Sequence, residues 1–175
     1  MNKTVLLTAV ALISACSKEP EVEAKNASVA EVAEQVAASG SAVKMKAGKW
    51  QTTAKVESVD GLSGPAADAM KQAMANAPVQ SFEVCMTEAD VNKPSGDMFN
   101  KSMQNCTYDR FTMGGGKLDA KMTCTMNGQS VVSTLDGTFG AERYTVVSNT
   151  EMEQPGVGKI TTRTRMESKR IGDCA

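Results

Sequence analysis

CTYDRFTMGGGKLDAKMTC, residues 106–124, places a run of alternating residues on each side of three consecutive glycines. Alternation with a period of two is typical of a half-buried strand, and a glycine cluster between two such runs indicates a chain reversal. The stretch therefore predicts a β-hairpin. With the turn centred on Gly115, the facing pairs are Cys106 with Cys124, Tyr108 with Met122, and Asp109 with Lys121.

The two cysteines of this hairpin face each other, which predicts a disulfide between Cys106 and Cys124 in an oxidising compartment. The mature domain has two further cysteines, Cys85 and Cys174, which are then left to bond to each other. Four cysteines allow three pairings, and the hairpin register selects this one. The second disulfide would tie the end of the chain to an earlier strand, where the terminus would otherwise fray.

The hairpin continues into a predicted antiparallel meander, because three more alternating runs follow it, separated by glycine and proline turn signals. The runs are Ser130–Leu135, Arg143–Met152 and Ile160–Ile171. Two alternating runs precede the hairpin, one containing Trp50, Thr52, Ala54 and Val56 and the other Phe82, Val84 and Met86. The predicted fold is mainly β (α+β), one disulfide-stapled antiparallel domain over residues 45–175.

Two short helices are expected within this domain. An alanine and methionine stripe from Pro65 to Ala77 predicts a helix that packs on the sheet, with Ser63 as its N-cap. Thr87 and Asp90 have the spacing of a capping box, which predicts a second, shorter helix.

The first residues of the chain have the pattern of a secretory signal, with Lys3 before an apolar stretch too short to span a membrane. The sequence LISAC, residues 12–16, resembles the lipobox of bacterial lipoproteins. This resemblance predicts a signal peptide over residues 1–15 and lipidation of Cys16; the alternative is a signal peptide cleaved elsewhere. By resemblance to Gram-negative lipoproteins, Ser17 favours the outer membrane, facing the periplasm.

Residues 16–44 are expected to form the lipidated cysteine and a flexible linker, because alanine, glutamate, valine, serine and lysine dominate and aromatic residues are absent. Val29, Val32 and Val36 recur at helical spacing, so a short amphipathic helix between Ser28 and Ser39 is the one element predicted within the linker.

Several short motifs in the domain resemble one known family. They are MKAGKW at 45–50, CMTEAD at 85–90, Cys106 with Tyr108, GGK at 115–117, MTC at 122–124 and RIGDC at 170–174. Together they resemble the bacterial domain-of-unknown-function family 3617, although Ala47 stands where a proline is expected. The resemblance implies an envelope protein. It carries over no catalytic or binding residue, because the family has none established.

Composition argues against several functional classes. The chain has no histidine, which removes Ser/His/Asp and Cys/His nucleophilic sites and the usual zinc sites. The formal net charge is −1, with one tryptophan, two tyrosines and four phenylalanines, so neither a basic field nor stacking platforms favour nucleic acid. We expect no catalytic residue, no cofactor and no metal.

Two groups of residues have both a chemical interpretation and a simpler structural one. Met122, Cys124 and Met126 share one strand face and would suit Cu(I), but methionine more often fills gaps in a core and a disulfide would consume the thiolate. Glu151 and Glu153 have a spacing close to that of glycosidase carboxylates, but two acidic residues at a strand end are more often a solvated rim.

The sequence thus predicts a non-enzymatic, lipid-anchored envelope protein that acts as an interaction or structural module. One alternative is a periplasmic binder of an apolar or lipid ligand, since a strongly curved sheet covered by one alanine and methionine helix would leave a cavity adaptable enough for lipid. A carboxylate-dependent envelope hydrolase, resting on Glu151 and Glu153 alone, is a further alternative. The expected partners are the membrane, through Cys16, and an envelope protein or apolar ligand.

Overall fold

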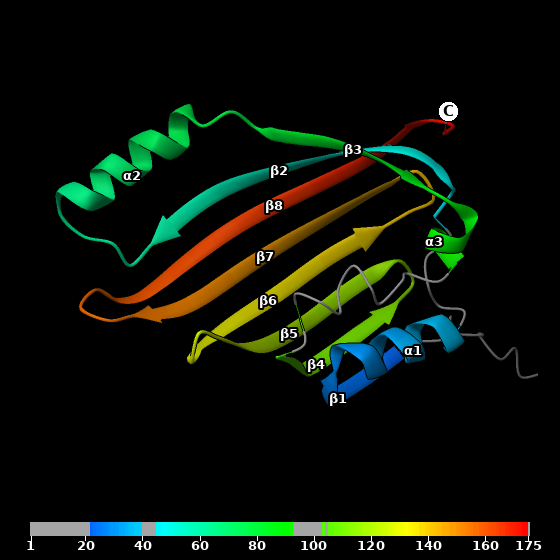
Figure 1. The fold of residues 1–175 in the computed structure, drawn as a ribbon, viewed down its shortest axis with the longest axis horizontal. Helices are drawn as coiled ribbons and strands as arrows, with labels where there is room; N and C mark the ends of the chain where they lie inside the picture. Colours follow the sequence, from blue (N-terminus) through cyan, green and yellow to red (C-terminus); the bar gives the residue numbers. More distant parts are fainter. Residues whose placement is uncertain (1–21, 40–44, 93–102, 104, 175) are drawn as a thin grey trace, which may run out of the picture.

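The computed structural model describes residues 22–39, 45–92, 103 and 105–174. Eight antiparallel strands form one sheet in the order β1-β4-β5-β6-β7-β8-β2-β3 (Figure 1). The strands are β1 (Val22–Ser28), β2 (Gly48–Asp60), β3 (Gln80–Met86), β4 (Cys106–Gly114), β5 (Lys117–Met126), β6 (Gln129–Phe139), β7 (Arg143–Gln154) and β8 (Gly158–Gly172). The helices are α1 (Val29–Ser39), α2 (Pro65–Asn76) and α3 (Glu88–Asn92).

The predicted meander is confirmed, since β4 to β8 lie side by side in chain order. β6 is longer than expected, because Asp136 and Gly137 continue the strand and do not end it. A Cβ atom at Gly137 would lie 2.8 Å from the Phe139 ring, so the absence of a side chain makes room for that ring. Gly137 therefore serves side-chain packing within the strand and does not mark a turn.

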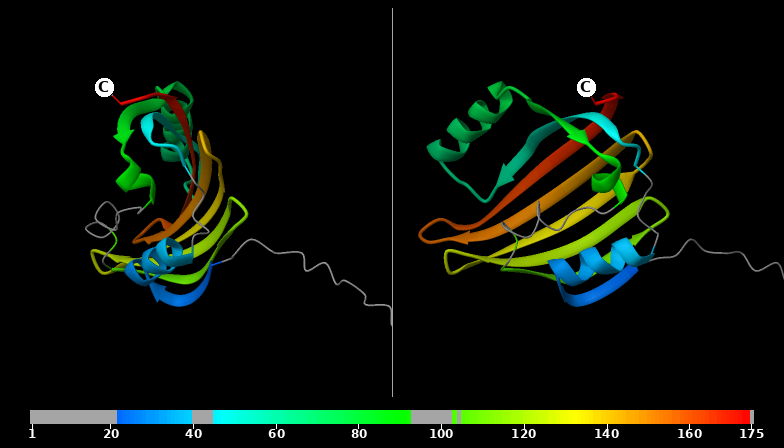
Figure 2. Two further views of the ribbon diagram at one scale, coloured as in Figure 1. Left: turned by 90° about the vertical axis from the view of Figure 1, so that its right-hand side faces the viewer. Right: turned by 45° about the vertical axis from the view of Figure 1, so that its right-hand side comes forward.

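The sheet is strongly curved, and α1 and α3 lie on its concave side (Figure 2). Facing residues of paired strands share one face of a sheet, so the register assigns each side chain to one side. We call the concave side, which carries Phe111, Ala120 and Trp50, the inner face, and the opposite side the outer face.

The central hairpin is present, with one irregularity. Cys106 faces Cys124 and Tyr108 faces Met122 as predicted, but Arg110, not Asp109, faces Lys121. Gly115 and Gly116, with φ of 56° and 73°, form a two-residue turn, which moves its centre half a residue beyond Gly115. A bulge at Asp109 then restores the cysteine pairing.

Both disulfides have the predicted connectivity, Cys106 with Cys124 and Cys85 with Cys174. The first joins facing residues of β4 and β5 and is buried on the inner face. The second joins β3 to the segment that follows β8, crossing the outer face of β2.

The prediction of a flexible linker over residues 16–44 was wrong for Val22–Ser39. β1 pairs with β4 at the sheet edge, and α1, the helix that the valine spacing predicted, packs above them. Taken alone, the segment has too little apolar surface to order itself. Val22, Ala24, Val32 and Val36 become buried only against Phe111 and Ala120 of the sheet. The ordered domain therefore includes β1 and α1.

The start of α1 shows why the chain turns from strand to helix at this point. Ser28 and Glu31 form a capping box, in which the Ser28 hydroxyl accepts from the Glu31 amide and the Glu31 carboxylate accepts from the Ser28 amide at 2.7 Å. The hydrogen bonds that the Glu31 carboxylate accepts from the Ser28 amide and from the Ser28 hydroxyl lower the pKa of Glu31.

The other two helices are peripheral. α2 lies beside the end of β2 (Figure 1) and was expected to pack on the sheet; only Ala67 among its described side chains is buried. Gly64, not Ser63, is its N-cap, with no side-chain cap bond. The capping box of α3 is confirmed, since the Thr87 amide donates to Asp90 at 2.7 Å and the Asp90 amide donates back at 3.2 Å.

Candidate functional site

The inner face combines a large area with an almost complete lack of charge. The register defines rows of facing side chains that run across the strands, and the middle row passes from Phe111 through Ala120, Leu135, Ser148 and Thr164 to Val56. At the inner-face positions of the described strands, Arg170 is the only charged side chain, and it lies at the end of β8. The inner face is therefore suited to contact apolar side chains or an apolar ligand.

Arg170 is occupied by the protein itself. Its guanidinium donates to the Ala47 carbonyl oxygen at 2.7 Å and pairs with Asp173. Gly48 gives it room, because a Cβ atom there would lie 2.6 Å from Arg170 Nε and 2.5 Å from the Gly172 carbonyl oxygen. Asp173 thus neutralises Arg170, the one charged side chain of the described inner face, at the margin of that face.

Buried side chains gather on the inner face under α1 and around Trp50. Under α1, the core residues Val22, Ala24, Ala27, Val32, Val36, Phe111 and Ala120 pack together. Burial raises the pKa of Tyr108 beside them. Across the sheet, Trp50 is fully buried, stacks on Tyr144 with ring centroids 6.0 Å apart, and donates to the Lys46 carbonyl oxygen at 3.1 Å.

Between these clusters lies a band of small hydroxyl side chains, which are half-buried. Its members are Ser133, Ser148, Thr150, Thr162 and Thr164, on β6, β7 and β8. Ser133 and Thr150 hydrogen-bond to each other at 3.0 Å, so that pair needs no further partner from a ligand. Small side chains keep this part of the curved sheet shallow, and the threonines add methyl groups to its surface.

Large apolar side chains remain exposed on the same face, Val56 and Met152 next to the hydroxyl band and Phe82 and Val84 on the edge strand β3. Val56 is 41% exposed, Phe82 53%, Val84 36% and Met152 39%, and all four are on the inner face by register. Scattered apolar exposure is ordinary, but several such residues on one uncharged concave face mark a binding surface.

The outer face has the opposite chemistry, because it carries many charged side chains and several of them form ion pairs with one another. Arg110 bonds Asp119 at 2.7 Å, and Glu57 receives both Arg163 and Arg165, at 2.8 and 2.6 Å. The hydrogen bonds from Arg165 and then Arg163 lower the pKa of Glu57. Paired surface charges of this kind keep a sheet face hydrated and discourage apolar contact.

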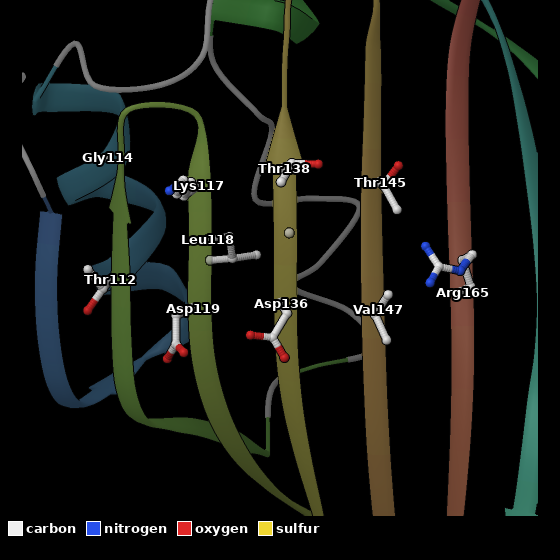
Figure 3. Close-up of a pocket in the computed structure, with 11 residues that line it drawn as sticks. Thr112, Gly114, Lys117, Leu118, Asp119, Asp136, Thr138, Thr145, Val147 and Arg165 are labelled. Atoms are coloured by element: carbon white, nitrogen blue, oxygen red, sulfur yellow. The ribbon is translucent and has the colours of Figure 1, made fainter.

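A hollow of about 620 Å³ lies on the outer face, and α1 is behind the sheet in this view (Figure 3). Asp119 and Asp136 face each other in it, Val147 follows, and Arg165 closes the row. Asp119 is bonded to Arg110 and Arg165 to Glu57, so two of its charged groups already have partners. It is an open depression in a solvated face, and we do not take it as the main site.

The predicted site residues are distributed as follows. Cys16 and the signal peptide lie outside the described residues. Met122 and Cys124 are buried side by side on one strand while Met126 is exposed, and the Cys124 sulfur is bonded to Cys106, so the thiolate of a Cu(I) site is missing. Across the described residues, no three cysteine or carboxylate side chains gather as metal ligands.

Glu151 and Glu153 lie on the outer face of β7, away from both the inner face and the hollow. Glu151 bonds Lys159 at 2.7 Å, and Glu153 faces that same lysine in the register. The pair therefore neutralises a neighbouring cation at a strand end, and this arrangement offers no support for the hydrolase hypothesis.

The residues of the inner face were not predicted to form one site, although the sequence contains a pattern that indicates this face. In β5, β6 and β7 one set of alternate positions is free of charge, and in β8 the matching set carries only Arg170, at the strand end; the curvature brings these positions together. The signal appears only when strands are placed in register.

Comparisons with known proteins give one match. Residues 45–174 match the family described as "Protein of unknown function (DUF3617)". The matched range begins after β1 and α1. No curated protein and no solved structure shows significant similarity to the chain. None of the helices in the described part of the chain is long and apolar enough to cross a membrane. Since the match covers most of the chain, including both disulfides, the protein belongs to the DUF3617 family.

Proposed function

We propose that this protein is a lipid-anchored envelope protein that binds an apolar ligand, of the kind that carries an acyl chain, on the inner face of its sheet. The observation that supports this proposal is the uncharged concave face with exposed Val56, Phe82, Val84 and Met152. Burying apolar surface contributes roughly 25 cal/mol per Å², and an acyl chain laid across the sheet would cover several of these side chains.

The ion-paired outer face supports the same assignment by contrast. A structural module that binds through its sheet would expose apolar or unpaired polar groups on the accessible convex side, where Arg110, Asp119, Glu57, Arg163 and Arg165 instead bond to one another. Ligand binding on the concave side therefore fits the side-chain distribution better than a general interaction module.

The proposed anchor places a source of ligand nearby. Only five residues separate Cys16 from Val22, the first residue of β1. An extended chain spans at most about 3.6 Å per residue, so the anchor would hold the β1 edge within about 20 Å of the bilayer. A membrane lipid is then the most accessible apolar ligand.

The anchor gives a first prediction. Wild-type protein is expected in the membrane fraction, and the Cys16→Ala variant with a normally cleaved signal is expected in the soluble periplasmic fraction, because acylation supplies the membrane affinity. Immunoblots of fractionated cells measure the distribution, and mass spectrometry of the N-terminal peptide identifies the acyl groups. Membrane association that persists in Cys16→Ala would contradict the anchor.

Ligand binding gives a second prediction, made with the fluorescent fatty acid cis-parinaric acid as probe. The Cys16→Ala protein should bind it saturably, and adding Val56→Lys should weaken binding at least about tenfold, because an ammonium group in an apolar contact is costly to desolvate. Fluorescence titration measures both dissociation constants.

The matched control is Val157→Lys. Val157 is 46% exposed, close to the 41% of Val56, but it lies in the turn between β7 and β8. This variant should bind the probe as the parent protein does. An absence of saturable binding by the parent, or equal loss in both lysine variants, would reject the inner face as the site. Native mass spectrometry of freshly purified protein then identifies any bound lipid.

A further inference from the structure

The two edges of the sheet are built differently. At the β1 edge, Lys25 lies on the strand, and the register with β4 skips Asn26, whose backbone is left-handed with φ of 49°. α1 packs against β1 and β4. A charged side chain, a bulge and a covering helix each hinder an edge strand from pairing with another chain. The β1 edge is therefore protected.

The β3 edge lacks the lysine and the bulge, and its one charged side chain, Glu83, is bonded to Lys49 within the sheet. From Gln80 to Met86 the register with β2 is unbroken, and the strand contains no proline, lysine or arginine. All of its residues except Met86 are exposed, and among the described strands it pairs with β2 alone (Figure 1). Its outward backbone N–H and C=O groups are available to a further strand.

The chemistry of β3 is self-complementary. Phe82 and Val84 lie on the inner face, whereas Ser81 and Glu83 lie on the outer face, where Glu83 bonds Lys49 at 2.5 Å. Antiparallel self-pairing centred on Glu83 would oppose two carboxylates, which is unfavourable. Pairing centred on Phe82 avoids this, because it places Phe82 opposite its own copy and Glu83 opposite Ser81.

We propose that β3 pairs antiparallel with β3 of a second copy of this chain, about a two-fold axis at Phe82. Gln80 then faces Val84 on the inner side, and Ser81 faces Glu83 on the outer side. Every inner-face residue meets an inner-face residue, so the two sheets join without a mismatch between their apolar and charged faces. The contact is isologous and closes after two copies.

The two-fold axis of an antiparallel strand pair is perpendicular to the sheet, so both inner faces open toward the same side. The two β1 edges, each beginning at Val22, then lie at the far ends of one continuous sheet. This arrangement is compatible with two anchors in one bilayer. The inference goes beyond the proposed ligand function and does not require it.

Charge substitutions at Ser81 test the pairing without touching the inner face. In the Cys16→Ala protein, Ser81→Glu would set a carboxylate opposite Glu83 at two places in each dimer, and Ser81→Lys would set an ammonium group there instead. We expect the parent and Ser81→Lys to sediment as dimers, and Ser81→Glu to raise the dimer dissociation constant about tenfold. Analytical ultracentrifugation over a concentration series measures it.

The outcomes separate clearly. A parent protein that stays monomeric at the highest concentration tested overturns the proposal, as does an equal effect of the two Ser81 variants. Unchanged melting temperatures confirm that both variants fold. Val56→Lys, which tests the ligand, should leave the dimer intact because Val56 lies on β2, one strand inside the edge. Failure of the ligand proposal and failure of the dimer proposal are thus distinguishable.

Discussion

Trp50→Ala is expected to lower the free energy of unfolding by about 3 to 5 kcal/mol, the usual cost of replacing a fully buried large aromatic residue by alanine. Trp50 has no exposed surface, stacks on Tyr144, and donates its indole N–H to the Lys46 carbonyl oxygen. The variant loses apolar burial, leaves a cavity and deprives a carbonyl group of its donor.

Urea denaturation followed by far-ultraviolet circular dichroism measures the loss. Val157→Ala is the control, because that side chain lies in an exposed turn and its truncation should change stability by less than about 0.5 kcal/mol. A Trp50→Ala protein as stable as the wild type would show that the cluster at this end of the sheet does not support the fold.

The double variant Cys85→Ser with Cys174→Ser is expected to lower stability by about 4.5 kcal/mol. This disulfide has a sequence separation of 89, and the chain-entropy model assigns a larger effect to a longer loop. The same model gives about 3 kcal/mol for Cys106 with Cys124, whose separation is 18.

The position of the strands that lose protection from hydrogen exchange gives a second test of the Cys85–Cys174 disulfide. Because β3 is held by β2 on one side and by this bond at its end, its amide hydrogens should exchange faster in the double variant, while those of β5 and β6 change least. Denaturation midpoints and hydrogen exchange measure the two effects. A loss below about 1 kcal/mol, or uniform exchange, would contradict the assigned role.

The parts of the fold that the sequence predicted are those set by local patterns. Alternation and turn glycines defined the meander, and the facing cysteines fixed both disulfides once the hairpin was in place. The bulge at Asp109 was beyond such patterns, because one extra residue leaves the alternation on each side intact.

The parts that could not be predicted depend on contacts between distant segments. Residues 22–39 are too poor in apolar surface to order themselves, and only the exposed edge of β4 gives Val22 and Ala24 something to pack against. The candidate site has the same origin. Ser148 and Thr164 are unremarkable polar residues in the sequence, and they become part of an uncharged surface only through strand register and sheet curvature.

The order of strands also has a consequence for how the chain folds. Every pairing within β4 to β8 joins neighbours in sequence, so this meander forms by closing short loops. β1 and β2 are separated by α1 and residues 40–47, yet they attach to opposite sides of the finished meander, beside β4 and β8. β1 can therefore join as soon as β4 is in the sheet, whereas β2, and β3 beyond it, must wait for β8. Until β8 is complete, the apolar residues of β2 and β3 have no sheet to join, and this interval is when the chain is most exposed to aggregation.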